Sequence, residues 1–391
     1  MIEPAPSREP ALGLSLRERW LREAHDWNLD AVEIIADAWF FAEEEVLVEL
    51  ERLRTRAPFF LHCLGMNVGS HDGLDPEYVD RVRTLADRFE VSAVSDHLAW
   101  RSVDGAWSTT FLPLRWDETS LRHVAERIHG IQERLGRTLA LETPAQYFRV
   151  KGSELSSAEA LLALHELCGS RALIDVCNLR ISAHHTGESL CDALDTLPMI
   201  GSYVHVAGFR QGQERWLDDH GSRPDVRTMA WAASTDLPVI LEWDRNMPDG
   251  PELSRLLVEL RRALARRTTA GEDPGPAQVT ALEDSGEALI DWQRSFMDQL
   301  MEGREPSLQA LFSEQVYSAL LLLEATFPVS TRLLGSNFRW FVREFVRQCA
   351  PSDVHARSWP AAFVRFLDGR EELDTPTKLY LMQEEWWRHA G

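Results

Sequence analysis

Short apolar segments alternate with longer stretches of helical periodicity across the first two thirds of the chain, and this alternation restricts its fold more than any other feature. Amphipathic stretches such as residues 76–88, 118–135 and 158–167 separate segments with the length and composition of strands. The strands are expected at residues 11–14, 31–36, 58–63, 91–96, 138–142, 171–175, 200–206 and 238–243. Strands alternating with helices in this way predict an α/β fold, a (β/α)8 TIM barrel over residues 1–265. A doubly wound open sheet is the competing architecture, although no GxGxxG motif follows the first strand.

The pattern changes after residue 265. Residues 266–280 are rich in Gly, Pro, Thr and charged side chains, a composition typical of a linker. Residues 281–391 show helical periodicity without strand signals. Helices are expected there at residues 290–301, 307–326, 337–347, 359–367 and 376–389. We therefore predict an all-helical C-terminal domain after the barrel and the linker.

Composition excludes several classes of function. The chain carries 62 acidic and 41 basic residues, a formal net charge of −21, which argues against bulk nucleic-acid binding. No apolar run is long enough to span a membrane, and the first residues lack the pattern of a secretory signal. Five cysteines without a CxxC pair fit neither a disulfide framework nor a zinc-thiolate site. We expect a cytoplasmic protein with no membrane or nucleic-acid partner.

Histidine and carboxylate side chains stand at or near the C-terminal ends of six predicted strands. These ends converge on one face of a TIM barrel, where active sites are built. A polar residue also simply marks the point where an apolar strand stops, but six such ends with the residue types of metal ligands favour a metal site. The candidate ligands on or after the strands and in one following loop are His62, His97, Glu142, Asp175, His205, Asp218, His220 and Glu242.

The ligand set indicates more than one metal ion. Four carboxylates forced together without cations would repel one another and shift each other's pKa values. Imidazole and carboxylate without thiolate suit Fe, Mn or Zn. Eight donors exceed the needs of one ion, so two or three ions with bridging carboxylates are implied, and Glu142 and Glu242 are the natural bridges.

Seven segments resemble, in order, the multinuclear non-heme iron-dependent oxidative enzymes that modify cysteines in ribosomally made peptides, as in methanobactin biosynthesis. The segments, within residues 10–255, are FFLHCLGMNVGS, VSDHLAW, LGRTLALETPAQY, LIDVCNLRISA, VHVAGF, LDDHG and ILEWDRNMP. The resemblance implies a TIM barrel with metal ligands at the eight candidate positions. It also implies two to three Fe ions (Fe2+/Fe3+), dioxygen as co-substrate, and a cysteine-containing precursor peptide oxidised at the cysteine β-carbon.

Three residues are expected to act beside the metal ligands. By the resemblance, Asn178 falls at the family's Asn next to the site, where it is a weaker candidate ligand. Asp96 precedes His97 and Asp244 closely follows Glu242, so both are candidates for orienting their neighbours.

The chain departs from the family pattern beside several ligands. The departures are at Thr143, Cys177 and Phe209 and in the amino-terminal strand, which reads GLSLRE, so we expect the metal ligands to be kept while their surroundings differ. His184 and His185 are predicted to lie in a loop after the segment LRIS, solvated or facing the substrate.

The helical tail resembles the helical part of the partner proteins encoded beside these enzymes. The resemblance covers about residues 307–368 and includes the segment FSEQVYSALLLLEATFPVSTRLLGSNFRWFVREFV. It implies an enzyme and its partner-like domain fused in cis, with the helical domain recruiting the precursor peptide. A helical oligomerisation domain would show the same spacing of apolar residues and is the alternative.

Three other functions fit the same pattern of residues. A hydrolase like the apurinic endonucleases with three zinc ions uses a barrel with a similar order of ligands, although the acidic balance counts against it. A sugar isomerase on a two-metal barrel lacks support from the motifs. The last alternative is a non-catalytic, metal-bound scaffold that binds a peptide without turnover.

Overall fold

The computed structural model describes residues 11–212, 215–266, 273, 279, 281–282, 288–302, 308–349, 359–368, 370, 376–377 and 380–381. The chain divides into two compact units. Unit 1 consists of Met1–Gly69, Leu74–Ala99 and Pro113–Glu283. Unit 2 consists of Ser70–Gly73, Trp100–Leu112 and Asp284–Gly391, so it takes in two segments from within the barrel sequence. Most of the linker predicted at 266–280 lies outside the described residues.

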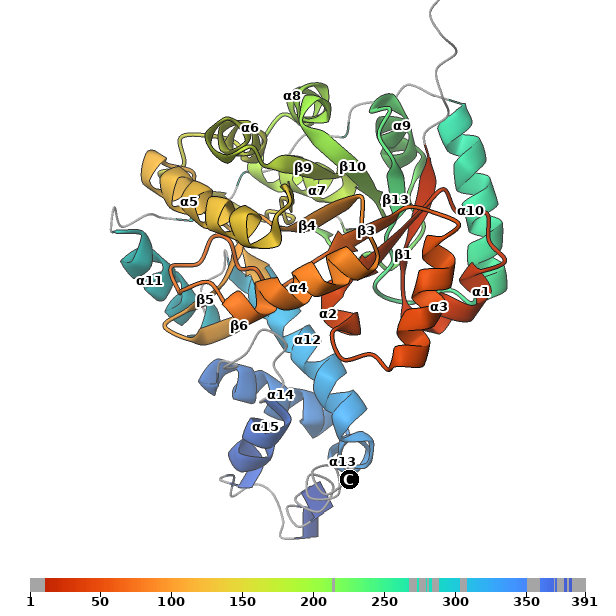
Figure 1. The fold of residues 1–391 in the computed structure, drawn as a ribbon. Helices are drawn as coiled ribbons and strands as arrows, with labels where there is room; N and C mark the ends of the chain where they lie inside the picture. Colours follow the sequence, from red (N-terminus) through yellow and green to blue (C-terminus); the bar gives the residue numbers. More distant parts are fainter. Residues whose placement is uncertain are drawn as a thin grey trace, which may run out of the picture. The chain divides into compact units, whose positions relative to one another are not determined.

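Unit 1 is built on a closed barrel of parallel strands (Figure 1), in the order β1-β13-β10-β9-β7-β4-β3-β2. This topology confirms the predicted TIM barrel, and every expected strand overlaps an observed one. The barrel strands are β1 (Leu12–Leu16), β2 (Ala31–Ile35), β3 (Phe59–His62), β4 (Ala93–His97), β7 (Leu139–Glu142), β9 (Arg171–Asp175), β10 (Gly201–Val206) and β13 (Val239–Leu241).

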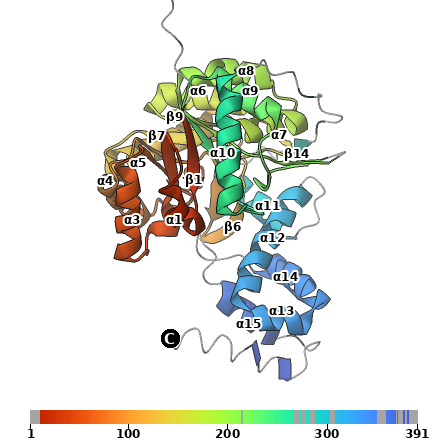
Figure 2. The ribbon, with the colours of Figure 1, turned by 90° about the vertical axis from the view of Figure 1, so that its right-hand side faces the viewer.

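Helices surround the barrel, and Figure 2 shows α10 alongside β1. The α-helices of this unit are α1 (Leu21–Ala24), α2 (Ala36–Trp39), α3 (Glu44–Arg54), α4 (Pro76–Arg88), α5 (Glu118–Leu135), α6 (Ser157–Cys168), α7 (Val176–Thr186), α8 (Leu190–Thr196), α9 (Val226–Ser234) and α10 (Gly250–Ala265). Two short 3-10 helices are Glu18–Trp20 and Leu197–Met199. Two small sheets pair β8 (Arg149–Val150) with β14 (Ala281–Leu282), and β11 (Arg210–Gln211) with β12 (Trp216–Leu217).

Local sequence explains why α5 begins and ends where predicted. Asp117 caps its N-terminus by accepting a hydrogen bond from the backbone N–H of Ser120. Gly136 ends the helix with a φ of 65°, a left-handed conformation that glycine adopts without steric cost. Val124 and Ile128 lie on the buried face of the helix, as the apolar spacing requires.

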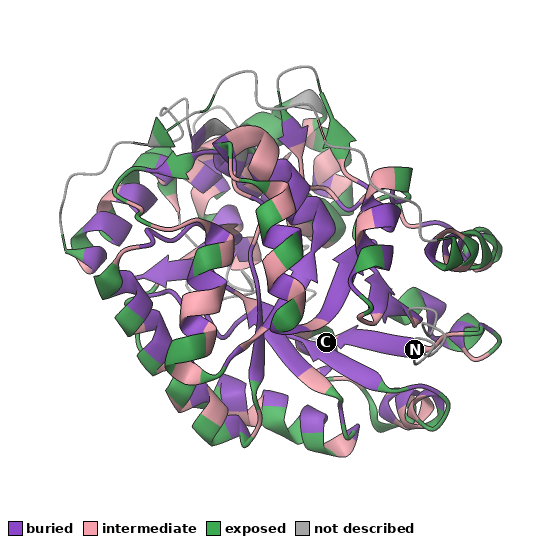
Figure 3. Ribbon diagram, turned by 90° about the horizontal axis from the view of Figure 1, so that it is seen from above, coloured by how far each residue is buried: buried purple, intermediate pink, exposed green. Residues whose placement is uncertain are grey.

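The interior of the barrel is filled by a layer of inward-facing side chains. Figure 3 shows the strands as buried and parts of the surrounding helices as exposed. The layer consists of Ala31, Phe60, Ala140, Leu173, Tyr203 and Ile240, each from a different strand. Because side chains alternate along a strand, the residue two positions further on faces the same interior.

Gly13 allows neighbouring strands to approach closely in this layer. A Cβ atom at Gly13 would lie 2.5 Å from the backbone oxygen of Ala31 and 2.6 Å from Cδ1 of Ile240. Gly13→Ala should therefore destabilise the protein by about 1–3 kcal/mol through overpacking, measured by urea denaturation. Gly130→Ala is the matched control, because its Cβ would meet only Leu74 at 3.8 Å. The control should stabilise α5 by up to about 1 kcal/mol. A neutral result for Gly13→Ala would contradict the close packing.

Unit 2 contains the helical C-terminal region, as the change in sequence pattern predicted. Its helices are α11 (Leu289–Glu302), α12 (Gln309–Thr326), α13 (Pro328–Leu334), α14 (Ser336–Gln348) and α15 (Trp359–Asp368). The short helix α13 was not predicted, and it begins at a proline, a residue favoured in the first helical turn. Most of the helix expected at 376–389 lies outside the described residues.

A β-hairpin from within the barrel sequence belongs to unit 2. It pairs β5 (Trp100–Val103) with β6 (Ala106–Leu112) in antiparallel fashion. The ring of Trp100 packs edge-on against Trp292, at 6.0 Å between ring centroids, and against Phe296, at 5.5 Å. The hairpin therefore forms part of the core of this unit. Among the described helices, none combines the length and the apolar composition needed to cross a membrane.

Candidate metal centre

Candidate ligands at the ends of the strands form a second layer inside the barrel, directly beyond the apolar one, while Asp218 and His220 lie in the loop after β12. His62 lies two residues after Phe60, Glu142 two after Ala140, and the same spacing links Leu173 to Asp175, Tyr203 to His205 and Ile240 to Glu242. Strand alternation therefore turns all five polar side chains toward the barrel axis. The barrel brings together residues that lie far apart in the sequence, and three neighbouring groups of donors result.

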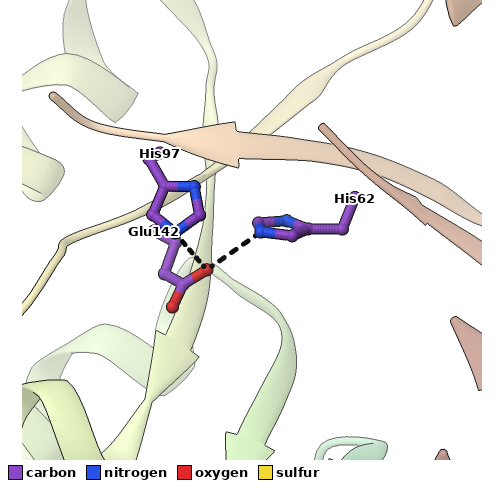
Figure 4. A group of neighbouring side chains, drawn as sticks. All are labelled: His62, His97 and Glu142. Carbon is purple, nitrogen blue, oxygen red and sulfur yellow. Dashed lines mark ion pairs between the residues drawn. The ribbon is translucent and has the colours of Figure 1, made fainter. Parts of the chain in front are cut away.

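The first group joins three side chains from neighbouring strands (Figure 4). Nε2 of His62 and Nε2 of His97 each lie 3.5 Å from the same oxygen of Glu142, Oε2. The strand register explains this arrangement, because β4 pairs His97 with Glu142 of β7 and pairs Ser95 with His62 of β3. Both histidines thus point a ring nitrogen at one carboxylate oxygen.

The second group shares Glu142 with the first. Nδ1 of His205 lies 3.0 Å from Glu242 Oε2, 3.8 Å from Glu142 Oε2 and 4.0 Å from Asp175 Oδ2. All four side chains are buried. Three carboxylates from three strands therefore surround one imidazole nitrogen.

The third group shares Glu242 with the second. Nδ1 of His220 lies 3.3 Å from Glu242 Oε2 and 3.3 Å from Asp244 Oδ2, while its Nε2 lies 3.0 Å from Asp218 Oδ1. His220 has a φ of 37°, which is uncommon for a residue other than glycine. The backbone N–H of Asp244 donates to the carbonyl of His220 at 2.9 Å and helps to hold this conformation. Arg17 donates to the other Asp244 oxygen.

The charges of the cluster depend on one another. Burial raises the pKa of Glu142 and of Asp175 above their ordinary values. Burial also opposes the charged forms of Glu242 and His205, but attraction between opposite charges prevails. His205 holds the pKa of Glu242 well below its usual value, and Glu33 together with Glu242 raises the pKa of His205 well above its usual value. The same balance between burial and the carboxylates Asp218 and Glu242 raises the pKa of His220. Without cations, the cluster therefore retains protons that divalent metal ions would displace.

Two buried carboxylate oxygens without hydrogen-bond partners in the described part of the chain indicate that the cluster suits metal ions. Within the described residues, Glu142 Oε2 and Asp175 Oδ2 are buried and have no hydrogen-bond partner. A buried carboxylate oxygen without a partner is costly unless a cation balances it. The donor set of imidazole and carboxylate oxygen matches what Fe, Mn and Zn bind. The cluster fits metal ions, and Glu142 and Glu242 each belong to two of the donor groups.

The three residues expected to assist the ligands lie beside them. Asn178 donates from Nδ2 to Glu142 Oε1 at 3.0 Å, which leaves Oε2 facing the histidines. Asp96 accepts hydrogen bonds from the backbone N–H of His97 at 2.6 Å and of Met66 at 2.8 Å. Asp244 contacts His220 as described above, so it lies in the third donor group.

The residues that depart from the family pattern have local roles. Thr143 is buried directly after Glu142, and Cys177 is buried with its thiol donating to the carbonyl of Ala207 at 2.8 Å. The ring of Phe209 packs 5.0 Å from the guanidinium of Arg180. That guanidinium is itself buried, and it pairs with carboxylates of the same chain, Asp225 and Asp273.

The prediction that His184 and His185 lie in a loop is wrong. Both belong to α7, which continues from Val176 to Thr186 and ends at Gly187 with a φ of 73°. The ring of His184 stacks on Trp216 at 4.3 Å between centroids, and Nε2 of His185 lies 2.9 Å from the Trp216 carbonyl. The helix extends because this packing holds its last turn, which the segment LRIS does not reveal.

Several residues that contact the candidate ligands were not predicted from the sequence. Glu33 in the middle of β2 accepts a hydrogen bond from Nε2 of His205 at 2.8 Å, and Ser95 contacts Nδ1 of His62 at 2.8 Å. Tyr203 contacts both Glu33 and Ser95. One signal was present, because a glutamate in the strand AVEII is placed among buried apolar neighbours and needs a partner. Arg17, at the end of β1, gave no such signal.

Comparison with known proteins identifies the family of the chain. A family model described as RiPP precursor modification enzyme MbnB/TglH/ChrH matches residues 11–266. The chain belongs to this family. The match covers the whole barrel and confirms the family resemblance inferred from the seven motifs. Its description makes the members enzymes that modify precursors of RiPPs, the ribosomally made peptides.

Curated relatives span the same region. The chain is 34% identical over 208 residues to a UPF0276 protein of Acaryochloris marina, covering 52% of this chain and 75% of that protein. It is 32% identical over 262 residues to a UPF0276 protein of Anaeromyxobacter sp. (strain Fw109-5), covering 64% and 90% respectively. Among solved structures, endonuclease IV from Thermus thermophilus is 17% identical with a TM-score of 0.44, covering 66% of this chain and all of that one, 100%.

Proposed function

We propose that the protein is a multinuclear iron-dependent oxygenase or oxidase that uses dioxygen to modify a cysteine of a ribosomally synthesised precursor peptide. One observation carries the proposal: three neighbouring donor groups are joined through Glu142 and Glu242 in a member of the RiPP precursor modification family. Adjacent groups that share carboxylates suit a multinuclear centre better than separate mononuclear sites.

The donors divide among the ions according to their groups. His62 and His97 with Glu142 would hold one ion, and Asp175 and His205 with the two shared glutamates a second. A third ion would lie at His220, Glu242 and Asp244, with Asp218 on the other side of the imidazole. When bound, iron would supply dioxygen chemistry and would bind the substrate thiol as a thiolate.

The chain's own thiols near the site are protected from competing with the substrate. Cys63 directly follows His62, and Cys177 lies between Asp175 and Asn178. Both are fully buried, and burial raises the pKa of each thiol above its ordinary value. The thiolate is the form that binds metals, so a peptide cysteine that enters the site has the advantage.

The peptide and its recruitment complete the proposal. The helical domain of unit 2 would present the precursor peptide to the barrel in cis, which is what its resemblance to the family's partner proteins implies. Cells would then need only one polypeptide for binding and for chemistry. Oligomerisation through the same helices is the competing role.

The test is reconstitution with iron and a peptide. The full chain is purified without oxygen, loaded with ferrous iron, and given dioxygen and a cysteine-containing peptide encoded beside its gene. We expect two or three iron ions per chain and a mass change at the cysteine, located by tandem mass spectrometry. The same peptide with serine in place of cysteine is the control and should stay unchanged. Fewer than two irons, or an unchanged cysteine peptide, would reject the proposal. Cleavage of an abasic DNA duplex by the zinc-loaded chain would instead support the hydrolase alternative.

A further inference from the structure

A continuous chain of hydrogen bonds runs beneath the candidate metal centre. Nδ1 of His62 lies 2.8 Å from Ser95 Oγ, and Ser95 Oγ lies 2.6 Å from the Tyr203 hydroxyl. The Tyr203 hydroxyl donates to Glu33 Oε2 at 2.8 Å, and Nε2 of His205 lies 2.8 Å from the same oxygen. All five side chains are buried, so water does not interrupt the chain. The chain links one candidate ligand in the first donor group to one in the second.

The direction of every hydrogen bond in this chain follows from one carboxylate. The Tyr203 hydroxyl donates to Glu33 Oε2, and Nε2 of His205 lies 2.8 Å from the same oxygen, so this one oxygen is the acceptor of both contacts. Tyr203 has a single hydroxyl proton, which it donates to Glu33, so its oxygen must accept from Ser95. Ser95 then has no proton left for His62, and His62 must donate from Nδ1. The whole chain therefore points toward Glu33.

This direction fixes which nitrogen of each imidazole can bind a metal ion. With its proton on Nδ1, neutral His62 presents the lone pair of Nε2 to the side where Glu142 lies 3.5 Å away. Nε2 of His205 is held by Glu33, so Nδ1, which lies 3.0 Å from Glu242, is the nitrogen that remains for a metal ion once its proton is displaced. The two histidines use opposite nitrogens, and the chain selects the correct one in each case.

We propose that Glu33, acting through Tyr203 and Ser95, is a positioning residue that fixes the tautomers of His62 and His205 together and so prepares two neighbouring metal positions at once. This inference rests on the metal centre of the proposed function. A carboxylate that accepts a proton from a ligating imidazole orients the ring and strengthens it as a ligand. Here one carboxylate serves two imidazoles, directly at His205 and through two hydroxyls at His62.

The test interrupts the chain of hydrogen bonds at Tyr203, its middle member. Tyr203→Phe removes the only hydroxyl between Ser95 and Glu33 without changing a candidate ligand. Zinc binding to the full chain, measured by competition with a chromogenic chelator, should weaken about 10-fold to 100-fold. Tyr78→Phe is the matched control, because Tyr78 is also a buried tyrosine that donates to a carboxylate, Asp37. The control should bind zinc like the wild type, and an equal loss in both variants would overturn the proposal.

A second readout separates tautomer selection from packing. In the metal-free chain labelled with 15N-histidine, His62 should carry its proton on Nδ1, with its signal assigned by its loss in His62→Gln. Both Tyr203→Phe and Ser95→Ala should give a mixture of tautomers at His62. In Tyr203→Phe, the Ser95 hydroxyl can donate to His62 instead of to Tyr203. In Ser95→Ala, His62 loses its hydrogen-bond partner at Nδ1. If either variant keeps the wild-type tautomer, the inference is wrong. Ser95→Ala keeps the test open if Tyr203→Phe fails to fold.

A double variant tests whether Ser95 and Tyr203 act as links of one hydrogen-bond chain or make independent contacts. Links of a single chain should not act independently, so Ser95→Ala with Tyr203→Phe should weaken zinc binding no more than the stronger single variant. Losses that multiply would contradict the proposal. The wild type separates this inference from the proposed function: if it binds no metal, the proposed function fails, whereas tight binding that none of the variants alters rejects the positioning role alone.

Discussion

Replacing Glu142 with glutamine should abolish peptide modification and weaken metal binding by at least about 100-fold, because changes to residues that only support a ligand already cost 10-fold to 100-fold. Oε2 of Glu142 lies 3.5 Å from His62 and from His97 and 3.8 Å from His205. Loss of this carboxylate therefore disrupts two donor groups at once. Metal content of the purified variant, measured by atomic emission, is the primary readout, and peptide mass is the second.

The stability of the same variant distinguishes loss of metal from loss of fold. In the metal-free protein, burial disfavours an ionised Glu142, as the raised pKa shows. Glutamine should therefore leave the melting temperature of the metal-free protein equal or higher. Glu188→Gln is the matched control, because burial also raises the pKa of Glu188, which lies outside the cluster and binds Ser157. The control should keep its metal and its activity. If Glu142→Gln retained full metal content, the shared-carboxylate arrangement would be incorrect.

Removing the metal ions should lower the melting temperature of the wild type by about 10 °C. Ions that bind only the folded chain stabilise it by about 4 kcal/mol at a concentration 1,000 times the dissociation constant. For a domain of this size, each kcal/mol shifts the melting temperature by about 2–4 °C. Calorimetry with and without a chelator, after anaerobic loading with ferrous iron, measures the difference.

The specificity of this shift can be checked with the variant already described. Glu142→Gln should melt at nearly the same temperature with and without the chelator, because it holds few ions to remove. A chelator effect of equal size in Glu142→Gln and in the wild type would show that the stabilising ions bind elsewhere. No shift in the wild type would mean that the cluster does not need cations to fold.

Much of the barrel and the positions of its candidate ligands could be predicted, because both depend on local sequence patterns. Strands such as the one ending at His62 are short apolar segments, and the candidate ligands stand at the ends where a barrel places its active site. The helices Pro76–Arg88 and Glu118–Leu135 were predicted to the residue, because capping aspartates and apolar spacing mark them. The excess of donors over one ion's needs predicted that some carboxylates are shared, but it did not assign this role to Glu142 and Glu242.

What could not be predicted depends on contacts between distant parts of the chain. Glu33 and Tyr203 are 170 residues apart in sequence, so neither residue's neighbours reveal their hydrogen bond. The helical state of His184 and His185 depends on packing against Trp216, which a local pattern does not contain. The identity of Asp244 as a donor beside His220 depends likewise on how one loop meets the end of β13.

The hairpin of unit 2 has a consequence for how the chain is made and how it can be shortened. Residues 100–112 are synthesised long before α11, yet Trp100 is fully buried and packs against Trp292 and Phe296 of that helix. During synthesis, Trp100 lacks these packing partners until the C-terminal region has been translated. An apolar side chain without its partners favours chaperone binding or aggregation in this period. A protein truncated after α10 would lack the packing of Trp292 and Phe296 on Trp100. Because residues 70–73 and 100–112 belong to unit 2, no single cut in the chain separates the two units.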